Sequence, residues 1–222
     1  MFIGHFGVAF AAKKLVPRAS LGTLFIAAQL ADLLWPAFVL LGIERFEIKP
    51  GYTAVTPLEF VHYPYSHSLL AMAFWGVAFA AAYAVLRRRP VAVAVTLAAL
   101  VLSHWLLDVL THAPDMPLTL WGGPMLGLGL WSSVAGTVAI ETALFAAGVA
   151  LYMKTTRPQD RIGSRALAAL VIFLFVVYLA NVFGPPPPSV TAVAWSGFAM
   201  WLLVAWGYWV DAHRQLALRL GG

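Results

Sequence analysis

The chain has 222 residues, of which 62% are hydrophobic and only 10% carry a charged side chain. A soluble globular domain has about 25% charged residues, so this composition excludes a water-soluble protein and indicates that much of the surface faces lipid. The formal net charge of +5 does not indicate a nucleic-acid partner, because the basic residues are confined to short segments between apolar runs.

Long apolar runs follow one another along the chain, and most approach or exceed the ~20 residues that cross a hydrocarbon core. They are Ser20–Ile43, Leu69–Leu86, Val91–Leu107, Gly127–Met153, Ala166–Phe183 and Ala192–Val210. The sequence therefore predicts an all-α, polytopic transmembrane helix bundle of about six spans. No polar stretch is long enough for a second folded unit, so residues 1–222 should form a single integral membrane domain.

The segments around the first runs carry further signals. Met1–Ala12 is apolar but too short to span, and basic residues follow it where a signal peptide would have them in front. We therefore expect a short N-terminal re-entrant helix. Ser20 and Ser66 are predicted to cap the first and second spans, and Pro36 should kink the first. The longest loop is Gly42–Tyr65.

Basic residues predict how the bundle lies in the membrane. If the chain crosses at every apolar run, one side receives Lys13, Lys14, Arg18, Arg87, Arg88, Arg89, Lys154, Arg157, Arg161, Arg165, Arg214 and Arg219. The other side receives only Arg45 and Lys49. This asymmetry follows the positive-inside rule, and it predicts a multi-pass membrane protein whose basic side and C-terminus are cytoplasmic.

Ionisable residues interrupt the apolar runs or lie at their ends. They are His5, Asp32, His67, His104, Asp108, His112 and Glu141. Such groups are costly at membrane depth and indicate function. The spacing of His104, Asp108 and His112 puts all three on one face of a helix. At 1.5 Å per residue from the basic ends, Asp32, His104 and Glu141 all lie roughly 20 Å deep.

This mixture of side chains indicates a metal site. The chain has no cysteine, so thiolate ligands are excluded. Imidazole and carboxylate ligands suit a divalent metal ion, with zinc favoured and manganese or iron also accepted. A metal ion offsets the cost of several carboxylates in a medium of low dielectric constant, and it lowers the pKa of bound water.

Several segments together resemble a known family. They are Gly4–Phe6, Gln29–Pro36, His62–Ser68, Ser103–Asp108, His112–Asp115 and Gly129–Ser133, with Glu141 following. They are similar to the bacterial membrane-bound, metal-dependent hydrolase-like family that includes a LexA-regulated inner-membrane protein. The resemblance covers most of residues 1–145, and it implies a metal-dependent hydrolase.

The order of these residues is also similar to that in the helical zinc-dependent phospholipases C. This looser likeness implies a first metal ion held by Asp32, His67, His104 and Asp108. His5 would help to hold a second ion bridged by Asp108, and His112 and Glu141 would belong to a third site. The phospholipases carry a histidine one turn before this glutamate, where the present chain has Thr137.

From the residues and the resemblance we predict a metal-dependent hydrolase that acts on a phospholipid or another phosphate or ester substrate from the outer leaflet. Glu141, as general base, and Asp108 are the predicted catalytic residues. The alternative is a transporter of a divalent cation or protons through the same cluster. Gln29 is almost the only polar residue in the cytoplasmic half of the spans, which disfavours transport. The three accompanying carboxylates disfavour a b-type haem site.

Overall fold

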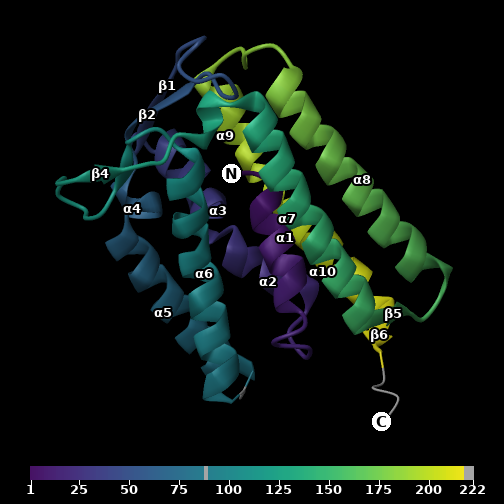
Figure 1. Ribbon diagram of the computed structural model, residues 1–222. Helices are drawn as coiled ribbons and strands as arrows, with labels where there is room; N and C mark the ends of the chain where they lie inside the picture. The colour runs from purple at the N-terminus through teal and green to yellow at the C-terminus, as the bar shows by residue number, and fades with distance from the viewer. Residues whose placement is uncertain (88–89, 218–222) are drawn as a thin grey trace.

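The computed structural model describes residues 1–87 and 90–217, which form a helical bundle with short β-ribbons at its ends (Figure 1). The helices are α1 (Ile3–Ala12), α2 (Leu21–Ala28), α3 (Leu30–Leu40), α4 (Pro64–His67), α5 (Leu69–Arg87), α6 (Val91–Thr111), η1 (Leu130–Ser132), α7 (Val134–Thr155), α8 (Arg161–Phe183), α9 (Val190–Phe198) and α10 (Met200–Ala212). The strands are β1 (Arg45–Ile48), β2 (Leu58–His62), β3 (Met116–Pro117), β4 (Met125–Leu126), β5 (Thr156–Pro158) and β6 (Arg214–Leu216).

The helices divide into membrane spans and shorter segments that fill the bundle. Among the described residues, α5, α6, α7, α8 and the α9–α10 pair are each long and apolar enough to cross a membrane. The bent pair α2–α3 makes a sixth span if it is counted as one. The predicted helical bundle of about six spans is therefore confirmed.

The first span is broken at Gln29, seven residues before Pro36, where a kink was expected. The axes of α2 and α3 meet at 58°, and Gln29 lies between them with non-helical dihedral angles (φ −112°, ψ 14°). Pro36 lies inside α3, where Gly197 of α9 leaves room for its ring. Irregular backbone at membrane depth is tolerated where protein surrounds it, and Gln29 is buried.

Helix α1 is enclosed by the bundle, as its apolar sequence and short length predict. It packs chiefly against α7, and it also contacts α2 and α6. Two glycines allow the close approach of α1 and α7. A Cβ atom on Gly148 would lie 2.0 Å from the carbonyl oxygen of Gly7, and a Cβ on Gly7 would meet the backbone of Leu144 at 2.6 Å. Small residues at such a contact let two helix backbones come together.

Serine side chains cap several helices. Ser20 accepts a hydrogen bond from the backbone N–H of Thr23, so its predicted role as the N-cap of the first span is confirmed. The prediction for Ser66 is wrong, because Ser68 accepts from Ala71 N–H at the start of α5. The Ser66 side chain is instead turned toward the interior, where it makes contacts described below.

The two ends of the bundle differ in charge. One end of the bundle, at the bottom of the view in Figure 1, contains the C-terminal ends of α1, α5, α7 and α10 and the β5–β6 ribbon. The basic residues of the described chain concentrate at this end. Lys13 pairs with Asp211 at 2.6 Å at this end. Arg88, Arg89 and Arg219 of the predicted basic side lie outside the described residues. The β1–β2 hairpin covers the opposite end, and the cluster of ionisable residues lies between the two ends.

Candidate metal centre

Five of the predicted ligands come together from four helices. His5 comes from α1, Asp32 from α3, His67 from α4, and His104 and Asp108 from α6. Two overlapping groups have ligand atoms within 4.8 Å of one another. One contains His5, His104 and Asp108, and the other contains Asp32, His67 and His104. These buried groups could hold a metal ion.

Four distances between histidine nitrogens and carboxylate oxygens of the cluster are close to those in a tetrahedral site. The Nε2 atom of His67 lies 3.3 Å from Asp32 Oδ1 and 4.0 Å from Asp108 Oδ2. The Nε2 atom of His104 lies 3.7 Å and 3.0 Å from the same two oxygen atoms. Zinc bonds of about 2.0–2.1 Å in a tetrahedron put ligand atoms about 3.3 Å apart. The four distances scatter around this value.

The hydrogen bond of His104 to the backbone directs its Nε2 into the cluster. Its Nδ1 lies 2.7 Å from the backbone oxygen of Ala28, which can only accept, so Nδ1 carries the hydrogen. Nε2 is buried and makes no hydrogen bond with the described residues. A neutral His104 would turn the lone pair of Nε2 toward two carboxylates, and a cation between them would stabilise this arrangement. In an unbroken helix the backbone oxygen of Ala28 would accept from an N–H one turn further on. The break at Gln29 leaves this oxygen free to accept from His104.

A chain of three side chains orients His67 in the same way. Ser66 donates its hydroxyl hydrogen to Glu44 Oε2 at 2.6 Å, so the serine oxygen must accept from His67 Nδ1, also at 2.6 Å. Glu44 is buried, and its other oxygen accepts from the backbone N–H groups of Tyr65 and Ser66. His67 Nε2 is thereby directed at Asp32 Oδ1, which lies 3.3 Å away. Partners of this kind fix the tautomer of metal-binding histidines.

The carboxylates are placed by helix geometry. Asp32 lies in the first turn of α3, where the positive end of the helix dipole stabilises a negative charge. Asp108 follows His104 by one turn of α6, so both side chains point the same way. Both carboxylates therefore face the histidine nitrogens from within regular α-helix.

The second group lies beside the start of α1. The rings of His5 and His104 are stacked at 3.8 Å, and His5 Nε2 lies 3.0 Å from Asp108 Oδ1. The amino nitrogen of Met1 approaches the same oxygen at 2.6 Å. Glu141 of α7 accepts hydrogen bonds from the backbone N–H groups of Phe2 and Gly4 through Oε2. Glu141 thus lies next to the cluster but is not part of either group of ligand atoms.

His112 belongs to neither group. Its Nδ1 lies 2.9 Å from Asp115 Oδ1, and its ring packs on Trp131 at 4.2 Å. Burial lowers the pKa of His112 below its ordinary value. Tyr63 donates to Asp115 at 3.1 Å, and burial, with Asp115 nearby, raises the pKa of this tyrosine well above its usual range. His112 and Asp115 form a dyad about one helical turn beyond the cluster.

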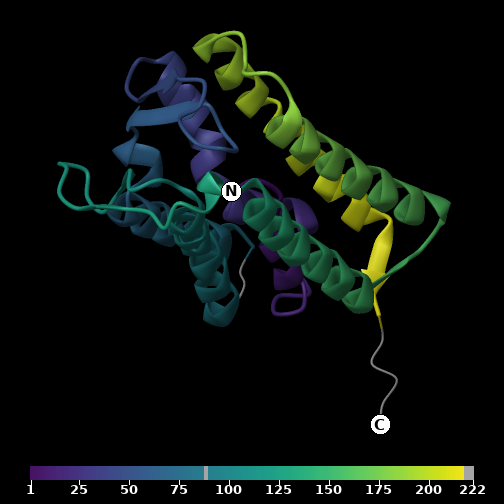
Figure 2. The same cartoon turned by 45° about the horizontal axis from the view of Figure 1, so that its top comes forward.

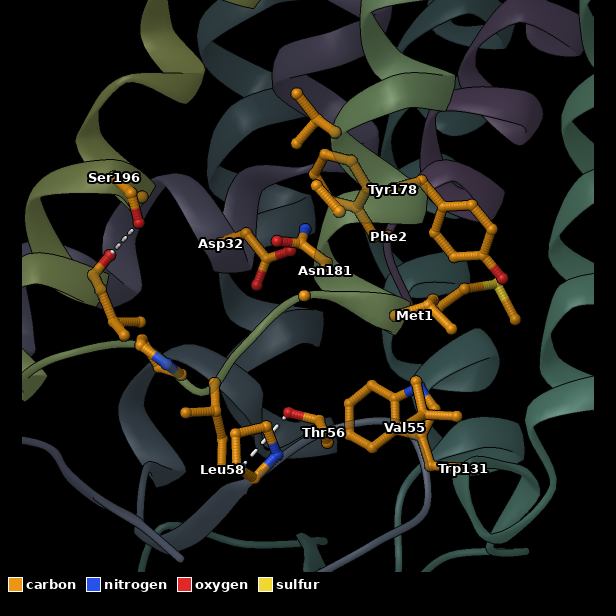
Figure 3. Close-up of a pocket in the computed structure, with 18 of the residues that line it drawn as sticks. Met1, Phe2, Asp32, Val55, Thr56, Leu58, Trp131, Tyr178, Asn181 and Ser196 are labelled. Atoms are coloured by element: carbon orange, nitrogen blue, oxygen red, sulfur yellow. Dashed lines mark hydrogen bonds between the residues drawn. The ribbon is translucent and has the colours of Figure 1, made fainter. Parts of the chain in front are cut away.

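A cavity of about 870 Å³ connects these residues (Figure 3). Its wall includes the predicted site residues Asp32, His67, Asp108, His112 and Glu141. The loop at positions 50–57 and the proline turn at positions 185–187 form its rim, and α8, α9 and α10 supply an apolar wall. The cavity volume is in the usual range for a small-molecule site, about 300–1,000 Å³.

Apolar side chains close the cluster off from the basic end. Phe6, one residue beyond His5 in α1, packs edge-to-face on Phe25 at 4.9 Å. Phe10 packs on Phe25 at 5.2 Å and on Tyr152 at 5.3 Å. These rings are buried, and the residues that line the cavity lie toward the opposite end of the bundle. The cluster is therefore open on one side and sealed on the other in this structure.

Comparisons with protein-family models, curated proteins and solved structures found no match to the chain.

The sequence did not reveal every residue that shapes this site. Glu44 and Ser66 were not among the predicted site residues, although they orient His67. Glu44 lies at the start of a loop that contains several other charged residues, so its composition gave no signal. The backbone oxygen of Ala28 was equally hidden, since no side-chain pattern marks a carbonyl group. A serine directly before a ligand histidine was the one available clue.

Proposed function

We propose that the chain is a metal-dependent hydrolase of the membrane that cleaves a phospholipid or another phosphate or carboxylic ester. One observation carries the proposal. His67 Nε2 and His104 Nε2 face the carboxylates of Asp32 and Asp108, and two overlapping groups of three ligand atoms there could hold a metal ion. The resemblance to the membrane-bound hydrolase-like family agrees with this assignment.

Asp32, His67, His104 and Asp108 would hold the first ion, and zinc suits this ligand set best. Manganese or iron would also bind to this ligand set. His5, with Asp108 as the shared ligand, would help to hold a second ion. Metal ions in such sites supply Lewis acidity, which activates water and polarises the oxygen atoms of an ester. The protein contributes the fixed ligand geometry and a pocket with restricted access to water.

Glu141 is the proposed proton acceptor. Its Oε2 is held by two backbone N–H groups, and its Oε1 makes no hydrogen bond with the described residues. The side chain lines the cavity beside the ligands. A carboxylate anchored through one oxygen can receive a proton on the other while keeping its position. Asp108 would take part in catalysis as the proposed shared ligand of the two ions.

Transport through the same cluster is the less favoured function. A transporter must open its site to both membrane faces, at least alternately. The rings of Phe6, Phe10 and Phe25 block the way to the basic end, and Gln29 is buried there without a hydrogen-bond partner among the described residues. An open side and a sealed side suit an enzyme that receives and releases its ligand on the same face.

We propose a bacterial inner-membrane location with the basic end and the C-terminus in the cytoplasm, in agreement with the positive-inside rule. Because the chain has no cysteine, a single introduced cysteine is the only thiol that a maleimide can label. In intact cells, an impermeant maleimide should label an Ala54→Cys variant and leave a Gln159→Cys variant unlabelled until the cells are opened. The reverse pattern would contradict this orientation.

Hydrolysis by the purified protein tests the function. We expect the zinc-loaded protein in detergent to cleave a phosphate ester from a panel of phospholipids and soluble aryl phosphates. Asp108→Asn should lower the rate by about two orders of magnitude or more, because a shared ligand is lost. Asp160→Asn, at the exposed start of α8 far from the cavity, is the control and should match the parent. Absence of cleavage of every ester by the metal-loaded parent would contradict the proposal.

A further inference from the structure

The cavity has a long apolar arm that the metal ligands do not use. Beyond the cluster it runs between α8 on one side and the α9–α10 pair on the other. The residues that line this arm include Phe173, Val177, Val193, Met200, Leu202 and Leu203. A site for a small water-soluble ester would need no such extension.

The arm opens on the part of the surface that faces hydrocarbon. Phe173 lies near the middle of α8 and is 45% exposed, and Leu202 of α10 is 71% exposed. Both line the cavity, and both lie in segments long and apolar enough to span a membrane. At that depth the neighbouring solvent is lipid. A ligand that enters here must therefore be soluble in the bilayer.

The floor of the arm is closed by a specific contact. The indole N–H of Trp206 donates to the backbone oxygen of Ala166 at 3.2 Å, and its ring packs on Phe173 at 5.8 Å. Helix α8 runs beside α10 (Figure 2), and this contact holds the two helices together toward the basic end. Above it the helices are separated by the cavity. The arm is thus a slot with a floor and an open flank.

Charge distinguishes a lipid from a soluble anion as the occupant. No lysine or arginine lines the cavity among the described residues, whereas Asp32, Asp108 and Glu141 do. Apart from the Met1 amino group, which is paired with Asp108, and the proposed metal ions, the lining therefore supplies no cationic side chain to attract a free phosphate from water. An apolar chain supplies its own driving force, about 0.8 kcal/mol for each buried methylene group.

We propose that the slot between α8 and α9–α10 binds an acyl chain of a membrane phospholipid, which enters sideways from the bilayer and presents its phosphate ester to the cluster. This inference rests on the proposed function for the chemistry, but the slot itself can be tested by binding alone. Asn181 and Ser196, which line the cavity on either side of the slot, are placed to contact the glycerol and ester region.

The experiment compares two neighbouring positions of α8. Val177 lines the slot, and Val176 is 57% exposed and does not line the cavity. A Val177→Trp variant should fill the slot, whereas Val176→Trp adds the same bulk on the lipid side. Each protein is placed in vesicles of phosphatidylethanolamine and phosphatidylglycerol that contain a phosphatidylglycerol with a diazirine on its acyl chain. After illumination, mass spectrometry maps the labelled residues.

We expect the parent and Val176→Trp to be labelled on slot residues such as Met200 and Leu203, and Val177→Trp to lose this labelling. The ratio of long-chain to short-chain phosphate ester cleavage should fall by about tenfold or more in Val177→Trp only. Equal labelling of the slot in all three proteins, or labelling confined to outward-facing residues, would overturn the inference whatever the activity. Slot labelling without hydrolysis of any ester would support the inference and contradict the proposed function.

Discussion

At the scale of single residues, the histidines of the cluster are held from the side that faces away from the carboxylates. Ala28 accepts from His104 through its backbone oxygen, and Ser66 accepts from His67 while donating to Glu44. The outer nitrogen of each ring is thus held, and Nε2 of each ring is directed at the carboxylates.

Glu44 provides a test of this arrangement. Replacing it with Gln keeps the size but puts an amide where a carboxylate accepts three hydrogen bonds. We predict that Glu44→Gln weakens zinc binding about 10- to 100-fold, because loss of an orienting partner has effects of this size. Isothermal titration with zinc would measure the change.

The matched control is Glu47→Gln in β1, where the side chain is exposed. It removes one negative charge from the same region but leaves the hydrogen bonds that orient His67 unchanged. Equal affinity losses in the two variants would show that net charge near the cavity, and not the orientation of His67, determines binding.

At this scale the sequence predicted the ligands better than their supports. His5, Asp32, His104 and Asp108 could be singled out because an ionisable group in an apolar run is rare and costly. Glu44 lies in a polar loop, where a carboxylate attracts no notice. Its importance depends on burial beneath Tyr65 and Ser66, and burial of a loop residue is a property of the tertiary structure.

At the scale of elements, the broken first span positions two parts of the site. The break at Gln29 ends α2 at Ala28, whose oxygen holds His104, and it begins α3 so that Asp32 lies in the first turn. Pro36 was the expected origin of a bend, because proline disrupts the helix interior. Its ring is accommodated against Gly197. Gln29 has no intrinsic tendency to break a helix, so packing around it decides the break, and sequence alone could not locate it.

The contact between α1 and α7 is the second element on which the site depends, because α1 carries His5. We predict that Gly148→Ala destabilises the protein by about 1–3 kcal/mol, since the added methyl group would overlap the backbone of Gly7. The midpoint of thermal unfolding in detergent should fall by several degrees. Ala147→Val, on the exposed face of the same helix, is the control and should change the midpoint little. Two variants of equal stability would contradict the close packing of α1 on α7.

At the scale of the whole molecule, hydrophobicity and length were sufficient to predict a helical membrane bundle, and the spacing of apolar runs predicted about six spans. The packing of α1 inside the bundle followed from an apolar segment too short to span. The sequence could not predict the cavity, because its walls come from α3, α8, α9 and α10, which are distant in the chain. It also gave no sign of the aromatic seal, since Phe6, Phe10 and Phe25 resemble any other apolar residues of a span.

The metal content of the purified protein tests the central claim most directly. Elemental analysis after incubation with zinc, manganese or iron and removal of the excess should find about one or two equivalents of metal in the parent. A His67→Ala/His104→Ala variant that still elutes as a single folded species should lose it, and His213→Ala, which changes a histidine at the basic end, should retain it. A parent that binds no metal under these conditions, or a double variant that binds as much as the parent, would contradict the account.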